Sequence, residues 1–398
     1  MIPDCIVQAK WIMPMDGPAI ENGVVKIGDG RILAVHKQTT RSCKSTDLGE
    51  VTLIPGLVNA HTHLEFSNLK QPLGCRGMNF VDWIAMVIGS RKNSDPHDKA
   101  KAIENGLAES STHGVVAIGE IATEPLLESS YQTDLHVTMF FERLGIRKEQ
   151  TDSTTDKCEE FLAASESHSF AKAISPHAPY SVHPALLARL VELSCKYKIP
   201  AAMHLAETTD EILMLDKQQG KFVELLESLG LWSDDIYPRG TRIFDLLKVL
   251  ARCPSSLVIH GNYLSENEIS FIALNCDRMS VVYCPRTHDY FEHAPYPLET
   301  FLNAGINVAI GTDSRASNPD LSLYAELKLI RNKFPRLDST TILKLGTASG
   351  ATALRLTKQF GVIKPGASGM LNVITTDSHD ELFSDKAECV LLSTWLER

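Results

Sequence analysis

The pair His61-Thr62-His63 is the first feature of this 398-residue chain that could do chemistry. Alternate residues of a β-strand share one face, so both imidazoles would point the same way if the pair lies on a strand. Two imidazoles on one face can hold one metal ion. Because the chain has 14 histidines, roughly half of one such pair is expected by chance. The spacing alone therefore leaves a metal site and two ordinary loop histidines about equally open.

The positions of other ionisable residues favour the metal site. His61 follows an apolar run that ends at Ala60, and four more apolar runs end in an ionisable side chain. Cysteine ligands are absent from these run ends except for Cys284. Three histidines and one aspartate suit Zn²⁺ or Fe²⁺. The four additional run ends carry His177, His204, His260 and Asp313.

Two carboxylates have positions that suit proton transfer. Asp313 lies in Gly311-Thr312-Asp313-Ser314, a short turn that can aim a carboxylate inward. Glu207 lies three residues beyond His204, which is too far past the strand end to hold the same metal ion. It can still reach a substrate bound above the metal, as a general acid must. Glu65 and Glu120 are lesser candidates, because either could be a solvated loop acid.

The elements that must position these residues follow an alternating pattern. Apolar runs of four to seven residues alternate with longer stretches of helical periodicity, which predicts βα units and a parallel sheet. Eight such units over roughly 250 residues favour a (β/α)8 TIM barrel, whose active sites form at the carboxyl ends of the strands. The segment 210–250 is long for one unit, and we expect extra helices over the barrel mouth, in the position of a lid. The runs are the one before His61 and those at 115–118, 135–141, 171–175, 200–205, 257–260, 279–284 and 306–311.

Both chain ends have a different pattern from the barrel. The first 55 residues read as short strands, with a hairpin turn at Asp29-Gly30. Near the C-terminus we expect helices at 320–333 and 338–358. The segments 361–366 and 371–374 then read as strands that return to the N-terminal sheet.

Composition and charge exclude several classes of protein. With 43% hydrophobic and 22% charged residues, the chain can bury a sizeable core and is not disordered. The net charge of −10 disfavours nucleic acids and anionic membranes as partners, and leaves a small-molecule substrate as the expected one. No run is long enough to span a membrane, the N-terminus lacks the pattern of a signal peptide, and nine scattered cysteines suggest a cytoplasmic protein. The oligomeric state stays open.

Three ordered motifs resemble the amidohydrolase superfamily, in its deaminase and chlorohydrolase branch. They are Pro55 to His63 (PGLVNAHTH), His204-Leu205-Ala206-Glu207 and Gly311-Thr312-Asp313, and the resemblance covers about residues 20 to 375. It implies an α/β fold in which 56–359 form the catalytic barrel. Residues 1–55 and 360–398 would then form a small β-sandwich.

The resemblance also implies roles for individual residues. His61, His63, His204 and Asp313 would bind the metal, and Glu207 would shuttle protons. His260 would orient the attacking hydroxide, while His177 would contact the substrate. Related dinuclear enzymes carry a bridging lysine at the end of the fourth strand, where this chain has His177, so we expect one divalent ion, Zn²⁺ before Fe²⁺. The implied reaction is hydrolytic deamination of an aminated heterocycle.

The substrate is less clearly indicated than the reaction. The segments 59–68 and 177–182 are especially similar to aminodeoxyfutalosine deaminases, which act on an adenine-type nucleoside. Adenosine-type enzymes of the branch usually carry a ribose-binding glutamate after the tryptophan that corresponds to Trp83. In this chain Lys92 lies close to the position of that glutamate, which argues against an ordinary adenosine-type substrate. We count Trp83 and Glu65 among the expected substrate contacts.

The segment after the seventh apolar run departs from the usual pattern of the branch. Arg286 and His288 follow that run, so we expect them to face the pocket, where the arginine would suit an anionic substrate group. An arginine paired with a surface acid is an equally good interpretation.

Two other functions and one other fold compete with a deaminase on a TIM barrel. Hydrolytic dechlorination or cyclic-amide hydrolysis could use the same mononuclear metal site. An assembly protein that has lost its chemistry would be expected to lack ligands, and all four are present. An open nucleotide-binding sheet would require a glycine-rich phosphate motif, which the sequence lacks.

Overall fold

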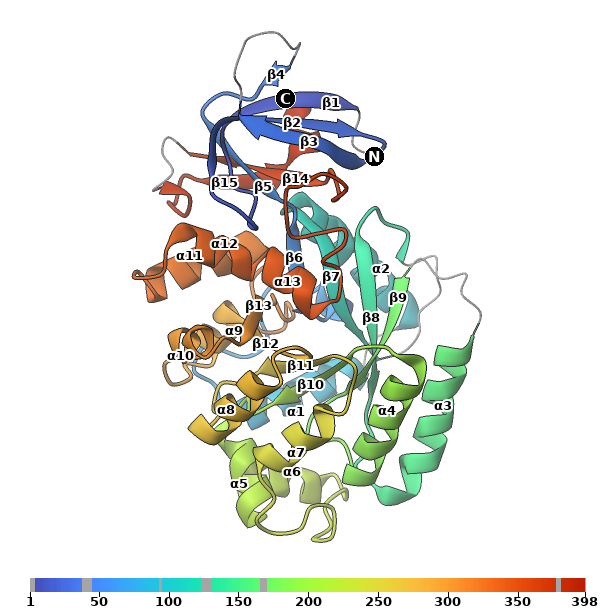
Figure 1. The fold of residues 1–398 in the computed structure, drawn as a ribbon. Helices are drawn as coiled ribbons and strands as arrows, with labels where there is room; N and C mark the ends of the chain where they lie inside the picture. Colours follow the sequence, from blue (N-terminus) through green and yellow to red (C-terminus); the bar gives the residue numbers. More distant parts are fainter. Residues whose placement is uncertain are drawn as a thin grey trace.

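Eight parallel strands form a barrel in the order β6-β7-β8-β9-β10-β11-β12-β13 (Figure 1). A parallel bridge between Thr62 and Asp313 joins the last strand region to the first and closes the barrel. The computed structural model describes residues 4–37, 45–92, 95–123, 131–164, 170–376 and 381–397, without the side chains of residues 92 and 96. The barrel strands are β6 (Leu57–Thr62), β7 (Val115–Ala122), β8 (His136–Arg143), β9 (Phe170–Pro176), β10 (Ala201–Leu205), β11 (Ser256–His260), β12 (Met279–Tyr283) and β13 (Asn307–Ile310).

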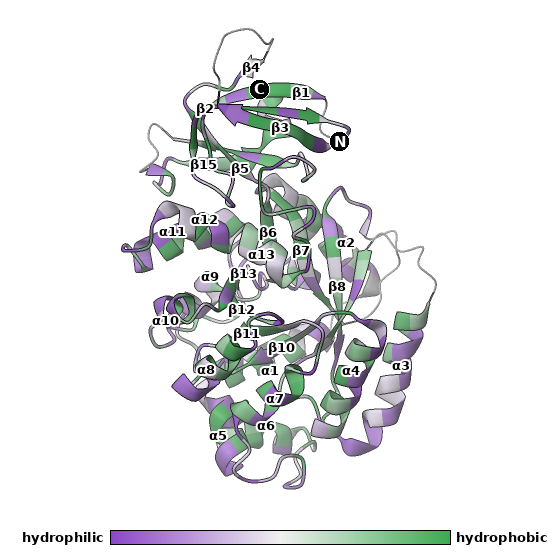
Figure 2. Cartoon of the chain, viewed as in Figure 1, coloured by the Kyte–Doolittle hydropathy of each residue, from purple (hydrophilic) through white to green (hydrophobic). Residues whose placement is uncertain are grey.

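The barrel strands are buried on both faces, which explains their nearly continuous apolar sequences. Every residue of β10, β11 and β12 is buried. Figure 2 shows the apolar character of these strands beside the hydrophilic outer surface of α3. Since parallel strands share one direction, all the ionisable residues at their carboxyl ends meet at one rim. The predicted TIM barrel is confirmed.

Helices connect the strands and cover the outside of the barrel (Figure 1). In α4, apolar residues recur at helical spacing and Leu186, Leu187, Leu190 and Val191 are fully buried. The helices that precede the sixth strand are α1 (Phe80–Lys92), α2 (Pro96–Thr112), α3 (Thr151–Ala163), α4 (Pro184–Tyr197), α5 (Thr209–Lys217), α6 (Lys221–Ser228) and α7 (Ile243–Leu250). Later helices are α8 (Glu266–Leu274), α9 (Pro285–Tyr290), α10 (Leu298–Asn303), α11 (Leu323–Lys333), α12 (Ser339–Leu345), α13 (Ala348–Ala353) and α14 (Leu392–Leu396), and short 3₁₀ turns occur at η1 (Leu64–Phe66) and η3 (Lys148–Gln150).

Both chain ends form one mixed sheet in the order β15-β14-β5-β1-β2-β3, with β4 paired to β1. The expected β-sandwich therefore takes the form of a seven-stranded sheet, drawn at the top of Figure 1. The predicted hairpin turn is present, with positive φ angles of 50° at Asp29 and 70° at Gly30. The strands are β1 (Cys5–Ile12), β2 (Ile20–Gly28), β3 (Arg31–Lys37), β4 (Thr46–Asp47), β5 (Val51–Pro55), β14 (Leu371–Thr375) and β15 (Glu388–Leu391).

Gly56 divides the apolar run before His61 between the two sheets. β5 pairs with β14 in the mixed sheet, while β6 begins one residue after Gly56 and pairs with β7 in the barrel. A Cβ atom at Gly56 would lie 2.7 Å from the carbonyl oxygen of Met370 and still closer to Val116. Glycine is therefore required where the chain passes from one sheet to the other.

The C-terminal region differs from the sequence prediction in two places. The expected helix 338–358 is two helices, α12 and α13, which are interrupted at Gly346 and Thr347. The expected strand 361–366 is wrong, because Gly361 and Gly366 have φ angles of 88° and 89° that an extended strand cannot contain. The strand expected at 371–374 is present as β14.

The segment 210–250 contains α5, α6 and α7. α6 contacts α1, so it lies across the mouth of the barrel as expected of the extra helices. Lys221 at the start of α6 pairs with Asp82 of α1, with 2.7 Å between the charged atoms. Among the described residues, no helix is long and apolar enough to cross a membrane. The eight described cysteines form no disulfide.

Candidate active site and metal centre

Four of the predicted ligands converge at the carboxyl rim of the barrel. His61 and His63 come from the end of β6, and Asp313 follows β13. Asp313 Oδ1 lies 3.6 Å from His61 Nε2 and 3.7 Å from His63 Nε2. His204, on β10, places its Nε2 3.3 Å from His63 Nε2. The ligand atoms of His61, His204 and His260 also lie within 4.8 Å of one another.

These distances and the state of the histidines fit a zinc ion. Zinc bonds of about 2.1 Å in a tetrahedron separate neighbouring ligand atoms by about 3.4 Å. Both ring nitrogens of His61 and Nδ1 of His63 are buried and have no hydrogen-bond partner among the described residues. Burial first, and the neighbouring imidazoles next, lower the pKa of His63 and of His204 well below the usual value. Neutral imidazoles of this kind are ready to bind a metal ion.

The backbone around the rim is strained in a way that aims these side chains. His260 and Asp313 have positive φ angles of 68° and 56°, which non-glycine residues seldom adopt. Asn59 holds the Asp313 turn, because its Nδ2 donates to Thr312 Oγ1 at 2.8 Å and its Oδ1 accepts from the amide of Thr312 at 3.2 Å. Thr62 Oγ1 donates to the carbonyl oxygen of Asp313 at 2.8 Å. These hydrogen bonds connect the end of β6 to the residues after β13, although the two segments are far apart in the sequence.

Glu207 lies beside the four candidate ligands and is almost fully buried. Its Oε1 is 3.3 Å from His260 Nε2. Burial raises the pKa of Glu207 well above its usual value, and the charges of Asp313 and Glu211 raise it further. A carboxyl group with a raised pKa retains its proton more readily than an exposed glutamate, which suits a general acid.

Asp313 has the opposite electrostatic character. Burial alone would raise the pKa of Asp313, but the close approach of the His61, His260 and His63 rings to its carboxylate outweighs burial and lowers the pKa. The pKa values of Asp313 and of the neighbouring Glu207 are thus shifted in opposite directions. Two carboxyl groups whose environments push their pKa values apart can act as base and acid in one reaction.

Two residues that the sequence analysis missed hold the Glu207 loop. Glu211 is fully buried, and its carboxylate accepts from the amides of Ala206 at 2.8 Å and Glu207 at 3.1 Å. Asn262 Nδ2 donates to the carbonyl oxygen of Glu207 at 3.0 Å. A glutamate four residues after Glu207 in an amphipathic helix looks like a surface residue, so no sequence signal marked it.

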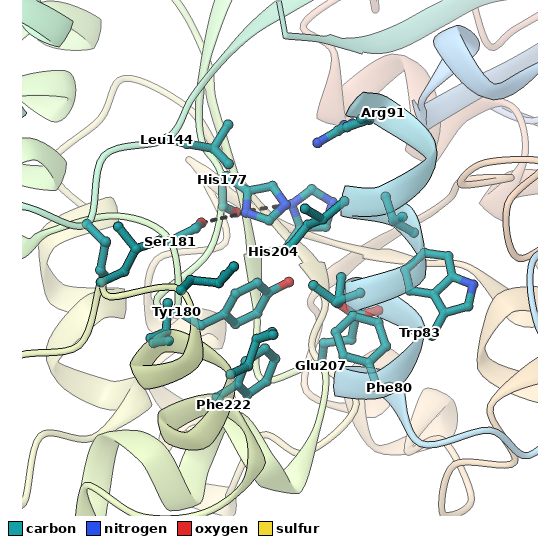
Figure 3. A pocket seen from close by; sticks show the side chains of 18 of the residues that line it. Phe80, Trp83, Arg91, Leu144, His177, Tyr180, Ser181, His204, Glu207 and Phe222 are labelled. Carbon is teal, nitrogen blue, oxygen red and sulfur yellow. Dashed lines mark hydrogen bonds between the residues drawn. The ribbon is translucent and has the colours of Figure 1, made fainter. Parts of the chain in front are cut away.

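A cavity of about 350 Å³ opens above this rim, within the range of small-molecule sites. Glu207, His260 and Asp313 contribute to its lining. Aromatic rings stand on its wall, with Tyr180 and Phe222 stacked at 4.1 Å between ring centroids (Figure 3). Trp83 also lines it, and its indole donates to the carbonyl oxygen of Ala316 at 3.2 Å. Phe80 and the aliphatic residues of α1 and α6 complete an apolar surround.

His177 lies on the cavity wall beside His204 (Figure 3). Its Nδ1 forms a hydrogen bond of 2.6 Å with Ser181 Oγ, and its carbonyl oxygen accepts from His204 Nδ1 at 3.0 Å. Burial first, and then the charge of Arg91, lower the pKa of His177 to about 3, so the ring is neutral. The structure therefore brings His177 and Trp83 to the cavity.

Arg286 does not face the cavity, which corrects our expectation. Its Nε donates to Glu326 Oε1 at 2.8 Å and its Nη2 donates to Asp320 Oδ1 at 2.7 Å. Glu326 is completely buried, so the arginine neutralises a carboxylate of α11 instead of a substrate. The pairing interpretation is the one that the structure supports.

His288 and Glu65 are also absent from the cavity lining. His288 is buried among aromatic rings, next to Tyr283 and Tyr296. Glu65 faces Arg91, with 2.5 Å between Oε1 and Nη2, and Arg91 is the residue that reaches the cavity. The sequence analysis missed Arg91 because it lies in a helical stretch where arginines are usually solvated.

Lys172 is not placed to bridge two metal ions. It lies near the start of β9, and its Nζ donates to the carbonyl oxygens of Phe161 at 2.9 Å and Ala164 at 2.8 Å. Those carbonyls belong to the end of α3, opposite the carboxyl rim of the strand. The side chain of Lys92 lies outside the described part of the structure.

Comparison with known proteins identifies the family and supports the fold. The model of the amidohydrolase family matches residues 52–397. A 5-methylthioadenosine/S-adenosylhomocysteine deaminase of Thermococcus sibiricus is 26% identical over 389 residues, which are 94% of this chain and 85% of the relative. The structure of Helicobacter pylori aminofutalosine deaminase with methylthio-coformycin aligns with a TM-score of 0.79 at 21% identity, covering 96% and 97% of the two chains.

A zinc-bound relative is also similar in fold. The adenosine deaminase of Xanthomonas campestris with bound zinc aligns with a TM-score of 0.73 at 21% identity, covering 96% of this chain and 89% of the other. The family model covers most of the chain, and the four-ligand rim lies inside the matched range. The chain therefore belongs to the amidohydrolase family and is a hydrolytic enzyme that acts on carbon–nitrogen bonds.

Proposed function

We propose that this enzyme is a mononuclear zinc-dependent deaminase that removes the exocyclic amino group of an adenine-type nucleoside. The observation that carries the proposal is the position of Glu207 next to Asp313 and the histidine cluster, at the floor of a cavity walled by aromatic rings. The relatives named above, which are deaminases of adenine-type nucleosides by their names, support the same substrate class.

Each residue of the site has its own role in deamination. A zinc ion held by His61, His63, His204 and Asp313 would supply the acidity that makes water nucleophilic near neutral pH. Asp313 takes a proton from the attacking water. Glu207 donates its proton to the ring nitrogen next to the carbon under attack, and His260, 3.3 Å from Glu207, contacts the oxygen that adds there. The proton taken up by Asp313 then passes to the exocyclic amino nitrogen, the bond between this nitrogen and the ring carbon breaks, and ammonia leaves.

The shape of the cavity suits a flat heterocycle. Tyr180, Phe222, Phe80 and Trp83 surround the space above Glu207. An aromatic ring packs favourably against such side chains by stacked or edge contacts. A purine lying between them would present its edge to the polar floor, where the amino group meets the proton-transfer residues.

The experiment that tests the proposal is ammonia release by the purified zinc-loaded enzyme. The panel contains aminodeoxyfutalosine, 5-methylthioadenosine, S-adenosylhomocysteine, adenosine, guanine and cytosine. We expect rapid ammonia release from at least one adenine nucleoside, and none from cytosine. Full activity without a bound divalent ion would contradict the metal-dependent mechanism.

A second readout separates deamination from the other hydrolytic reactions. The same enzyme is incubated with a chlorinated triazine and with a cyclic amide, and chloride release and ring opening are followed. If chloride release or ring opening is observed and no nucleoside releases ammonia, the enzyme is a chlorohydrolase or a cyclic-amide hydrolase that uses the same site, and not a deaminase.

A further inference from the structure

The mouth of the catalytic cavity carries exposed leucine side chains that the reaction described above does not use. Leu144 is 45% exposed and Leu229 is 40% exposed, and both line the cavity. They come from different segments, because Leu144 follows β8 and Leu229 caps the C-terminus of α6. Large apolar side chains that stay exposed at the edge of a binding cavity mark a surface that a ligand covers.

Helix α6 forms an apolar wall that leads from the catalytic floor to this mouth. Phe222, Leu226 and Leu229 recur at helical spacing and line the cavity. Their exposed fractions rise in that order from 1% to 5% to 40%. Phe222 stacks on Tyr180 on the side of the pocket where Glu207 lies (Figure 3). Because a helix rises 1.5 Å per residue, the wall continues for about 10 Å beyond Phe222.

Two other segments complete the mouth. The loop after β8 contributes Leu144 and Ile146, and it is joined to the end of α6 because Arg147 Nη2 donates to the carbonyl oxygen of Gly230 at 2.8 Å. Helix α1 contributes aliphatic side chains that follow Trp83 along its cavity face. The apolar mouth, as we call this surface, consists of Val87, Ile88, Leu144, Ile146, Leu226 and Leu229.

The charges next to the apolar mouth are already paired with one another. Arg91 is the one arginine or lysine among the described residues that line the cavity. Its Nη2 lies 2.5 Å from Glu65 Oε1 and 3.8 Å from an oxygen of Glu142, a buried glutamate at the end of β8. A carboxylate of the substrate would therefore meet two carboxyl groups that already face this guanidinium. Burying such a charge is costly, whereas a hydrocarbon group gains free energy by covering the leucines.

We propose that the substrate carries an uncharged apolar substituent longer than a methyl group, and that Leu144 and Leu229 select it. The heterocycle lies between the aromatic rings with its amino group at the catalytic floor, and the substituent extends along α6 to the mouth. A longer thioether of 5′-deoxyadenosine fits this surface. S-adenosylhomocysteine and aminodeoxyfutalosine fit it less well, because each carries a charged group at the far end. This inference rests on the proposed function, because it assumes an adenine-type nucleoside in the cavity.

The test compares nucleosides whose substituents differ in length and in charge. It uses calorimetry on the zinc-loaded full chain with Glu207→Gln, so that binding is measured without rapid turnover. The ligands are the 5′-methylthio, ethylthio, propylthio and butylthio derivatives of 5′-deoxyadenosine. We expect Kd to fall about two- to fourfold for each added methylene, as for a methylene group that leaves water.

A charged ligand of matched size tests the second half of the proposal. The 5′-(3-carboxypropylthio) derivative carries a carboxylate in place of the terminal methyl group of the butyl chain. It should bind at least about tenfold more weakly than the butylthio compound, because the carboxylate has no counter-charge of its own at the mouth.

Matched variants connect the effect to the apolar mouth. Leu144→Asn and Leu229→Asn, each added to Glu207→Gln, should lower the gain to below about 1.5-fold per methylene and change Kd for the methylthio compound less than about twofold. Both leucines are partly exposed, so the thermal midpoint should stay near that of the parent. Leu274→Asn is the control, since Leu274 on α8 is 85% exposed and lies outside the cavity lining, and it should preserve the gain.

Three results would overturn the inference. One is a Kd that does not depend on chain length, or no binding by any of the compounds. Another is a carboxylate compound that binds as tightly as the butylthio compound, which would make Arg91 part of an anion site. The third is a dimer in sedimentation analysis that Leu229→Asn dissociates, because a second copy of the chain would then cover these leucines.

The experiment also separates this inference from the proposed function. Ammonia release by wild type from the methylthio compound, together with a Kd that is flat across the series, would disprove only the inference. Binding that strengthens with chain length, without ammonia release from any nucleoside, would disprove only the proposed function.

Discussion

His63 Nε2 and His204 Nε2 lie 3.3 Å apart, although the two residues are 141 positions apart in the sequence. Both rings are buried, and burial together with neighbouring histidines lowers the pKa of each well below its usual value. Two neutral imidazole nitrogens at this distance need a proton or a cation between them, because their lone pairs otherwise repel. A metal ion satisfies both nitrogens at once.

We therefore predict that metal binding stabilises the enzyme and depends on this pair. The purified wild-type chain should contain about one zinc ion, and a strong chelator should lower its thermal midpoint. His204→Asn should lower the metal content severalfold, as measured by elemental analysis. His183→Asn is the matched control, since His183 caps α4 through the amide of Ala185 and asparagine caps helices well. Equal metal content in both variants would contradict the assignment.

Glu207 is predicted to act in catalysis without holding the metal. Glu207→Gln keeps the size of the side chain but cannot transfer a proton, so kcat should fall by about 10²–10⁴. The zinc content should stay at the wild-type value, because the four ligands are untouched. Steady-state ammonia release and elemental analysis on the same preparation check both parts. A variant with wild-type kcat, or one that loses its zinc, would remove Glu207 from this role.

The positions of the metal ligands could be predicted because they depend on a repeated pattern. Each apolar run is a buried parallel strand, so a residue at or just after its carboxyl end must lie at the active-site rim of a barrel. His204, His260 and Asp313 are all found by this rule. The rule does not predict which distant residue a side chain at the rim will pair with, however, and Arg286 is an example. It also follows a strand, but Glu326, 40 residues away on α11, captures its side chain.

Glu142 and Arg91 could not be predicted for a related reason. An acid or a base at the end of an apolar segment is usually solvated, and nothing local indicates that α1 folds over the end of β8. Their roles depend on contacts between distant segments. The prediction of a strand at 361–366 failed for a local reason. Its two glycines adopt positive φ angles, which a pattern of apolar residues does not reveal.

Arg286 is predicted to stabilise the fold and not to select the substrate. Arg286→Met leaves Glu326 buried without its ion pair, which should cost about 3–5 kcal/mol of unfolding free energy. The thermal midpoint should fall, and the double variant with Glu326→Gln should recover part of the loss. The ratio of kcat/KM for an acidic and a neutral substrate should not change. A selective rise in KM for the acidic substrate would restore Arg286 to the pocket.

The stability of the enzyme should depend on pH through Glu142. The pKa of this carboxyl group is about 7 in the folded chain, against an ordinary value of 4.5. A raised pKa stabilises the protonated folded state, so its contribution is fully present below about pH 4.5 and is lost as the pH rises through 7. Glu142→Gln cannot ionise and should not show this loss.

The quantity to measure is therefore the difference in stability between wild type and Glu142→Gln at each pH. Between pH 5.5 and pH 8, wild type should lose roughly 2 kcal/mol of unfolding free energy relative to Glu142→Gln. Other titrating groups, including the metal ligands, are common to both chains, so their effects cancel when thermal midpoints are compared at each pH. Midpoints that change in parallel over this range would mean that Glu142 is already ionised at pH 5.5. In that case Arg91, 3.8 Å away, would hold Glu142 as an anion in the folded chain.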